Sequence, residues 1–434
     1  MESPFPRPSA ASLWAARAVP AQDFAPLCDD VQADVAVVGG GYTGLSAALA
    51  LAERGERAIV LEASTVGWGA SGRNGGVVSA KFRAPFQAIA AAHGIEVARR
   101  MHAIAHDSVG TLERMIAEHD IPEAGYARVG QLKCAHTPQA LASAVADMEW
   151  MRREIGDASV TRLTGEEVAA ETGSRDFVGG VLSARAGGLH PLNYARGLAR
   201  AAHARGIAIH EGSPATELRR EAGGIRVATS RGSVRARQVI VATNGYSDLT
   251  PATEPLRTRL VPFRSAILAT EILSDNLRAA MLPTRRICVE TRRMMRWFRM
   301  VDGRMVYGGR GAFGRHDTAA AFADLRRAMV RTFPALADTP VSHQWSGLVA
   351  MTLDALPHVG RLDDRVTFAM GYNGAGVAMS THLGRYAAAF ALGESPDVGL
   401  LGTHAFQPLP FYGLREPVIR LVAGWYQFLD AIGR

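Results

Sequence analysis

The stretch Asp34-Val-Ala-Val-Val-Gly39-Gly-Gly41-Tyr42-Thr43-Gly44-Leu45-Ser-Ala-Ala48 decides the fold of this 434-residue chain. Its apolar start is typical of a buried strand, its GxGxxG pattern of a tight turn, and its Ala/Leu-rich end of a helix. Gly39 permits the turn, Gly41 lets a pyrophosphate approach the backbone, and Gly44 lets the helix pack close to the strand. Phosphates there would meet the N–H groups and the positive end of the helix that follows, so Gly39, Gly41, Tyr42, Thr43 and Gly44 are candidate cofactor-binding residues. The stretch therefore predicts a dinucleotide-binding fold.

An acidic residue follows the second strand of this unit. The apolar run Ala58–Leu61 ends at Glu62, about 20 residues beyond Gly41, where a carboxylate accepts hydrogen bonds from a ribose diol. A negative charge at this position repels a 2′-phosphate, which disfavours NADP. FAD and NAD share the arrangement, so the turn and the acid leave both cofactors open.

Composition excludes several other classes of function. The net charge of +7 comes from scattered arginines, with lysine only at Lys81 and Lys133, and no basic stripe predicts nucleic-acid binding. The cysteines Cys28, Cys134 and Cys288 are far apart and form no CxxC or Cys/His pattern. We therefore expect no disulfide framework, no metal site and a cytoplasmic location. The opening segment does not match a signal peptide, and no apolar run is long enough to span a membrane.

The remaining chain alternates β-branched runs with helical stretches, which predicts an α/β fold. Four runs are expected to form one parallel sheet: Asp34–Val38, Ala58–Leu61, Gly206–His210 and Gln238–Ala242. Helices from about Phe86 to His119 and from Pro138 to Ile155, and a strand-rich stretch from Leu260 to Gly309, indicate a second domain inserted twice. We assign residues 1–85, 186–248 and 343–434 to the dinucleotide-binding domain, and residues 86–185 and 249–342 to a substrate domain of sheet and helices.

A hairpin is predicted within the strand-rich stretch. Asp302-Gly303 is a dipeptide that tolerates the positive φ angles of a type I′ turn. That turn pairs Met300 with Met305, Phe298 with Tyr307, Arg299 with Val306 and Trp297 with Gly308. One face is then apolar, and the other is expected to form a pocket wall of Trp297, Arg299, Val306, Gly308 and Arg310.

The segment after Glu62 carries a family resemblance. Ala63-Ser64-Thr-Val-Gly67-Trp68-Gly69-Ala70-Ser71-Gly72-Arg73-Asn74-Gly75-Gly76 resembles the flavin-cradling loop of the FAD-dependent D-amino-acid oxidase and sarcosine oxidase superfamily. The resemblance is closest to the gamma-glutamylputrescine oxidoreductase branch and covers nearly the whole chain. It recurs at Gly188–Asn193, Val239–Gly245, Trp345–Pro357 and Gly371–Val377. It implies a Rossmann-like FAD-binding domain of the glutathione-reductase type.

The resemblance also implies a set of cofactor contacts. Small residues let the backbone lie against a planar isoalloxazine, and the helix that follows Gly371–Val377 points its N-terminus at the flavin pyrimidine. The candidate FAD-binding residues of these later segments are Ala63, Ser64, Gly69, Ala70, Ser71, Arg73, Asn74, Gly75, Gly76, Thr243, Asn244, Gly347, Gly371, Gly374, Gly376 and Val377. No cysteine lies near Gly347, where relatives attach the flavin, so FAD is expected to bind non-covalently.

The implied chemistry is oxidation of a carbon–nitrogen bond. Hydride passes from the carbon beside a neutral amine to flavin N5, and water hydrolyses the resulting imine. Gamma-glutamylated polyamines and sarcosine-like or pipecolate-like amino acids remain open as substrates, as do a flavin monooxygenase and a non-catalytic FAD-binding scaffold. Several oxygen-using relatives place a lysine where this chain has Val306, so the electron acceptor is either dioxygen or another acceptor, such as a quinone or carrier protein.

Four residues are candidates for the active site: Arg299, Val306, Arg310 and Trp345. Arg299 or Arg310 is predicted to hold a substrate carboxylate, because arginine binds carboxylates bidentately. Surface ion pairs across the hairpin are the competing interpretation, and Arg73 is the next candidate. The isolated His190 and His358 are expected to be scaffold residues.

Overall fold

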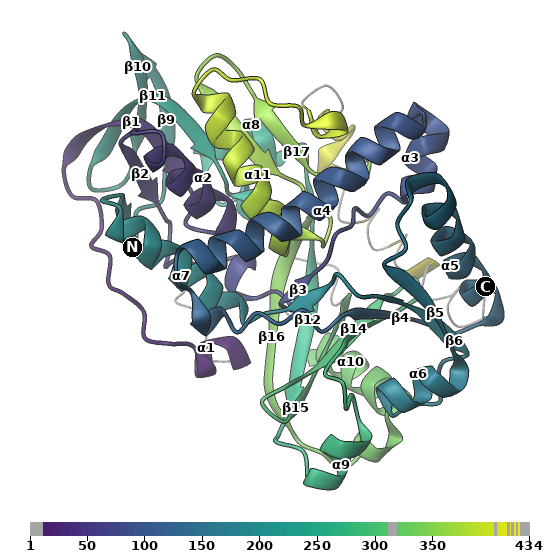
Figure 1. The fold of residues 1–434 in the computed structure, drawn as a ribbon. Coiled ribbons are helices and arrows are strands. Elements are labelled where there is room, and N and C mark those ends of the chain that lie inside the picture. Colours follow the sequence, from purple (N-terminus) through teal and green to yellow (C-terminus); the bar gives the residue numbers. More distant parts are fainter. Residues whose placement is uncertain are drawn as a thin grey trace.

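The computed structural model describes residues 12–310, 319–402 and 406–414, together with positions 417, 421, 424 and 425. Two large sheets lie one above the other in the view of Figure 1, and helices pack against both. The long strands β12 (Val261–Thr270) and β16 (Val341–Met351) run between the two regions. The predicted α/β fold class is confirmed.

The first sheet contains the predicted parallel strands. Its main path is β17-β18-β11-β1-β2-β8, and β10 and β9 extend from β11. The strands are β1 (Asp30–Val38), β2 (Ala58–Leu61), β8 (Ala208–His210), β9 (Glu217–Glu221), β10 (Gly224–Ala228), β11 (Ser233–Val241), β17 (His358–Arg361) and β18 (Val366–Met370). Strand β1 pairs in parallel with β11 and β2, and β2 pairs in parallel with β8. All four predicted strands are therefore confirmed in one parallel array.

Four helices build the main apolar core beside this sheet: α2 (Tyr42–Ala52), α4 (Ile95–Glu118), α7 (Pro191–Ala204) and α11 (Gly376–Ala391). Helix α2 starts directly after the glycine turn and is buried almost throughout, because α7 and α11 flank it. Helix α4 has one apolar face, which packs against α11. The predicted helical segment from Phe86 is confirmed but is interrupted at Gly94, whose φ is +92°, so that α3 (Phe86–His93) precedes α4.

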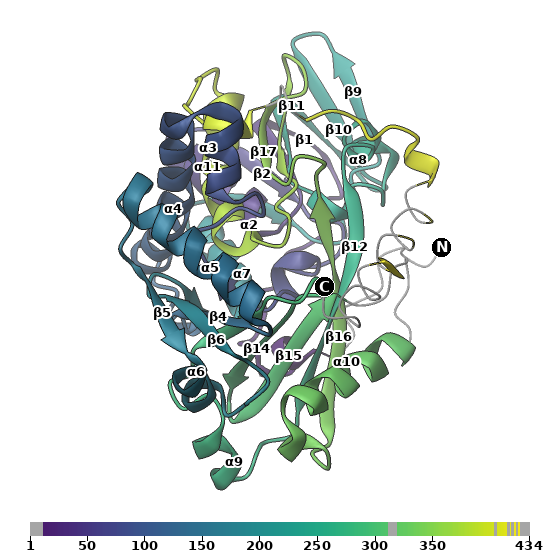
Figure 2. The same ribbon diagram turned by 90° about the vertical axis from the view of Figure 1, so that its right-hand side faces the viewer.

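The second sheet has the order β16-β12-β15-β14-β13-β4-β6-β5. Its other strands are β4 (Gln131–Ala135), β5 (Val160–Thr164), β6 (Gly179–Ser183), β13 (Ile287–Glu290), β14 (Arg296–Val301) and β15 (Arg304–Arg310). Its helices are α5 (Pro138–Trp150), α6 (Gly165–Thr172), α9 (Asp275–Ala280) and α10 (Ala319–Thr332). Figure 2 shows α10 alongside β15, and α10 also packs against β12. Phe298 and Tyr307 fill the core on that side, together with Phe333 after α10.

The predicted hairpin is confirmed in turn and register. Asp302 and Gly303 have φ angles of +47° and +73°. Strands β14 and β15 pair Phe298 with Tyr307 and Arg299 with Val306, as the two-residue turn requires. The apolar face of the hairpin is therefore buried, and the opposite face points towards the first sheet's loops.

Short elements complete the described chain: α1 (Leu13–Arg17), α8 (Glu254–Arg257), and the strands β3 (Val77–Val78) and β7 (Gly187–Gly188), which pair with each other. The domain boundaries remain a prediction. The boundary predicted at 343 falls within β16, which pairs with β12 of the second sheet. The boundary predicted at 86 separates α4 from α11, although these two helices pack together. Both contacts favour moving these boundaries. Within the described residues, no helix combines the length and apolar character needed to cross a membrane.

Candidate functional site

A cavity of about 620 Å³ lies between the glycine turn of the first sheet and the wall of the second. It collects most of the predicted cofactor residues: Gly39, Gly41, Tyr42, Thr43, Glu62, Ala63, Gly69, Ala70, Ser71, Arg73, Asn74, Gly75, Thr243, Asn244, Gly347, Gly374, Gly376 and Val377. Gly44, Ser64, Gly76 and Gly371 are predicted residues that do not line it. Segments far apart in the sequence therefore meet around one space.

The glycine turn is crowded in the way the sequence predicts. Gly39 has a φ of +115°, and a Cβ on it would lie 2.9 Å from the carbonyl oxygen of Ala242. A Cβ on Gly41 would lie 2.8 Å from Ser71 Oγ, and one on Gly44 would overlap the carbonyl oxygen of Gly39. Gly44 thus allows close contact between α2 and β1, whereas Gly39 and Gly41 leave the backbone accessible from the cavity.

Glu62 follows β2 and lies beside the glycine turn. The backbone N–H of Gly40 donates to Oε2 at 2.7 Å, and that of Ser64 donates to Oε1 at 2.9 Å. Burial raises the pKa of Glu62 to about 7, although these two hydrogen bonds act in the opposite direction. The carboxylate is therefore oriented in advance and is ready to accept further donors from a ribose.

The small-residue loop 67–76 is held by its own hydrogen bonds. Arg73 Nε donates to the Trp68 carbonyl at 2.7 Å, and its guanidinium lies over the Trp68 ring at 5.1 Å. Asn74 Nδ2 donates to the Ala70 carbonyl at 3.0 Å. A Cβ on Gly75 would lie 2.6 Å from the Trp297 ring, so the loop backbone rests directly on the second sheet.

Arg299 has a different place from the one predicted. Its Nη1 donates to three carbonyl oxygens, those of Gly75 at 3.1 Å, Gly76 at 3.2 Å and Leu189 at 3.1 Å. Burial lowers the pKa of Arg299 to about 10, and its side chain does not line the cavity. A guanidinium that is already engaged with three carbonyls positions the loop rather than holding a substrate.

Two further active-site candidates, Val306 and Trp345, do not line the cavity. Val306 is completely buried, and Trp345 is nearly so; both belong to an apolar cluster with Trp14 and Trp297. Trp345 Nε1 donates to the Arg73 carbonyl at 3.0 Å, which makes it a support for the loop. The side chain of Arg310 lies outside the described residues.

A second loop closes the site from the first sheet. Asn244 Oδ1 accepts a hydrogen bond from Gly371 N at 2.9 Å and thereby joins the end of β11 to the segment before α11. Thr43 and Tyr372 hydroxyls lie 2.6 Å apart, linking the starts of α2 and α11. The residues at the N-terminus of α11 line the cavity, which gives this region a second positively polarised helix end.

Sequence reasoning missed three contributors to the site. Trp14 in α1 donates from Nε1 to the Asn74 carbonyl at 2.8 Å, although nothing in the Pro-rich opening segment signals such a role. Tyr246 lines the cavity, and its ring meets that of Trp68 edge-on with 5.4 Å between the centroids. Lys81 also lines the cavity; its only signal in the sequence is the rarity of lysine. His190 caps α7, and His358 contacts Asp354, as expected for scaffold residues.

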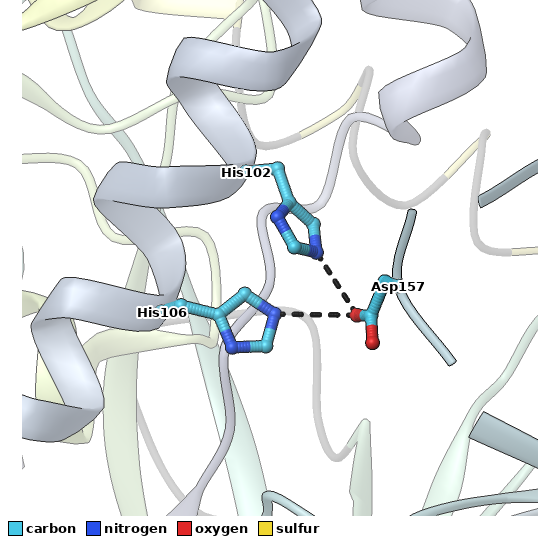
Figure 3. A group of neighbouring side chains, drawn as sticks. All are labelled: His102, His106 and Asp157. Carbon is cyan, nitrogen blue, oxygen red and sulfur yellow. Dashed lines mark hydrogen bonds and ion pairs between the residues drawn. The ribbon is translucent and has the colours of Figure 1, made fainter. Parts of the chain in front are cut away.

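A group of titratable side chains lies apart from this cavity. His102 and His106, on α4, point their Nε2 atoms at Asp157 Oδ2 at 3.0 and 3.5 Å (Figure 3). His106 Nδ1 faces Arg185 Nη1 at 3.2 Å. A guanidinium only donates, so Nδ1 is the acceptor and the ring proton sits on Nε2, facing the carboxylate. That arrangement is a hydrogen-bond network which holds the turn at Asp157 on α4.

The main cavity fits the parts of FAD in order. Its glycine turn can receive the diphosphate, Glu62 the ribose, and the small-residue loop the flat ring. The sequence of residues 34–390 matches the family model of DAO, described as FAD-dependent oxidoreductases. The chain belongs to this family. As a member of the DAO family, it is an FAD-dependent oxidoreductase.

Relatives of this family extend over almost the whole chain. Gamma-glutamylputrescine oxidoreductase of Escherichia coli K12 is 33% identical and covers 97% of this chain and 98% of its own length. Glycine oxidase of Bacillus licheniformis is 24% identical over 83% of this chain and 93% of its own. The crystal structure of glycine oxidase from Geobacillus kaustophilus superposes with a TM-score of 0.72 at 20% identity, covering 87% of this chain and 99% of that one. The DAO fold predicted from the glycine turn and its neighbouring loops is confirmed.

Proposed function

We propose that this enzyme oxidises the carbon–nitrogen bond of a small amine or amino acid to an imine, which water hydrolyses to a carbonyl compound and an amine. The observation that carries the proposal is the continuity of one cavity from the dinucleotide cradle to an apolar wall on the second sheet. Phe263, Ile267, Val289 and Trp297 line that wall. FAD, when bound, supplies the hydride acceptor.

The residues of the chain have the remaining tasks. The apolar wall excludes water from the reacting carbon and favours the uncharged amine. The N-terminus of α11 provides a positively polarised edge at which negative charge is stabilised. We propose that this edge faces the flavin pyrimidine.

Two features bear on the cofactor and its acceptor. None of the described lining residues is a cysteine or a histidine, which supports non-covalent FAD. Acid precipitation should therefore release intact FAD into the supernatant, and yellow colour retained in the pellet would contradict this. Val306 stands where several oxygen-using relatives place lysine, so we propose that the electron acceptor is either dioxygen or another oxidant. Comparing the rates at which air and a quinone reoxidise the reduced flavin distinguishes the two.

The preferred substrate is a gamma-glutamylputrescine-like amine, and its support is the similarity to the enzyme of that name over nearly the whole chain. A sarcosine-like or pipecolate-like amino acid is the second candidate, supported by the similarity to glycine oxidases in both sequence and fold.

An anaerobic titration tests these proposals. Gamma-glutamylputrescine, putrescine, glycine, sarcosine and pipecolate are added separately to the holoenzyme, and flavin absorbance is followed. We expect at least one amine to bleach the flavin without NAD(P)H. Bleaching by NADPH alone would identify a monooxygenase, and no bleaching by any reductant would favour a non-catalytic scaffold.

A further inference from the structure

Lys81 lines the cavity. It follows β3 by three residues, and Gln131 of β4, Val289 of β13 and Trp297 of β14 line the same cavity. The chain has lysine at only one other position, Lys133. Lys81 is therefore the only lysine among the described residues that line the cavity.

The ammonium of Lys81 has no counter-ion within the described residues. It forms neither an ion pair nor a hydrogen bond with any of them. Burial, together with the positive charge of Lys133, lowers its pKa to about 8. An ammonium that is drawn out of water without a partner costs free energy that a bound anion recovers.

The charged side chains along the described cavity wall also favour an anionic ligand. Its cationic side chains are Arg73, Lys81 and Arg83, whereas its one carboxylate is Glu62. Glu62 is held by the backbone at the ribose end. Arg73 bonds to the Trp68 carbonyl, and Arg83 is exposed to water. Lys81 is thus the cation of this wall that combines partial burial with freedom to bind a ligand.

We propose that Lys81 binds the carboxylate of the substrate, and hence that the substrate class is an amine that also carries a carboxylate. This inference rests on the proposed amine oxidation and refines its substrate. A fixed cation also repels the second ammonium of a free diamine, so Lys81 selects amino acids or glutamylated amines over unmodified polyamines. It takes the role that Arg299 cannot fill.

A binding experiment without turnover tests the site directly. Glutarate, a dicarboxylate without an amine, is titrated into the holoenzyme while flavin absorbance reports occupancy. For Lys81→Met we expect the dissociation constant to rise at least thirtyfold, which corresponds to about 2 kcal/mol. The dissociation constant for glutaramide, the uncharged diamide, should be similar in wild type and Lys81→Met. Lys133→Met is the matched control, because Lys133 is exposed and does not line the cavity.

The wild-type enzyme provides a test that needs no variant. Lys81 loses its charge as the pH rises through its pKa, whereas Arg73 and Arg83 stay charged. Glutarate affinity should therefore fall by up to tenfold per pH unit above about pH 8, the pKa of Lys81 without ligand, and level off above its pKa in the complex, which anion binding raises. Lys81→Arg should retain affinity at high pH. Constant wild-type affinity up to pH 11, or equal affinity in wild type and Lys81→Met, would overturn the proposal.

Measurements of turnover distinguish failure of the Lys81 proposal from failure of the proposed amine oxidation. Gamma-glutamylputrescine is compared with 4-aminobutanoylputrescine, the same amide without the carboxylate. Lys81→Met should raise KM for the first at least thirtyfold and leave the second nearly unchanged. Failure of every amine to bleach the flavin would remove the proposed oxidation while the glutarate titration still decides the anion site. Equal losses for both substrates would show that Lys81 does not recognise the carboxylate.

Discussion

Replacing Glu62 by glutamine should both weaken FAD binding and remove its pH dependence. The substitution Glu62→Gln keeps the size of the side chain but loses the charge that accepts from Gly40 N and Ser64 N and that we propose accepts from a ribose diol. Loss of a charge-assisted hydrogen bond costs about 1–3 kcal/mol, so at pH 8 we expect the dissociation constant for FAD to rise roughly 5- to 150-fold.

The pH dependence follows from the burial of the carboxyl group. In the protein without FAD, the pKa of Glu62 is about 7 rather than the ordinary 4.5, a difference of roughly 3 kcal/mol. Hydrogen bonds from the ribose favour the ionised form and lower that pKa, so binding releases a proton. Wild-type affinity should therefore rise, by up to about tenfold per pH unit, as the pH increases from about 5 to 7, and should level off above 7.

Fluorescence titration of the apoprotein with FAD between pH 5 and 8.5 measures both effects. Glu62→Gln should give a flat profile that approaches the wild type at pH 5, where the wild-type carboxyl is already protonated. Glu211→Gln is the control: Glu211 lies outside the cavity lining, and its charge helps to raise the pKa of Glu62. This control should keep the profile but shift it to lower pH. The same pH profile in wild type and Glu62→Gln would refute the ribose assignment.

Three further predictions concern the scaffold of the site. Gly44→Ala should prevent FAD binding, because its Cβ would overlap the Gly39 carbonyl. The control Gly110→Ala should bind FAD normally in the same titration, because the nearest atom to its Cβ is Arg114 Nη1 at 3.7 Å. Arg299→Met should lower the free energy of unfolding by about 2–4 kcal/mol and weaken FAD binding, since three carbonyls lose their donor; a change in substrate KM alone would contradict this role. Burial lowers the pKa values of His106 and His190 to about 4. The free energy of unfolding should therefore fall by about 1–3 kcal/mol per residue as the pH drops from 6.5 to 4. Equal stability in urea unfolding at pH 7 and pH 5 would contradict this prediction.

The local parts of the cofactor site could be predicted from the sequence. A strand, a GxGxxG turn, a helix and Glu62 lie within about thirty residues, and their geometry depends on backbone sterics and short-range packing. The register of the β14–β15 hairpin is also local, because a two-residue turn determines which residues face each other. Such features need no knowledge of the rest of the chain.

The direction of side chains into the cavity could not be predicted in this way. Arg299 lies on the predicted face of the hairpin, yet the carbonyls of Gly75, Gly76 and Leu189 occupy its guanidinium. Those carbonyls come from segments distant in sequence, so their approach depends on how the two sheets pack. Hairpin register determines a face, but only the neighbouring chain determines whether that face is a cavity wall or a buried contact.

The sequence by itself determined the nucleotide-binding fold, the cofactor class and the loops that surround FAD, because those properties reside in contiguous motifs with restricted backbone geometry. Only the tertiary structure decided that Lys81 lines the cavity without a partner among the described residues, that Arg299 and Trp345 bond to the loop 67–76, and that Val306 is buried in an apolar cluster. The physical reason is that burial and charge pairing arise from residues brought together across the two sheets, and such long-range contacts leave no pattern in either segment alone.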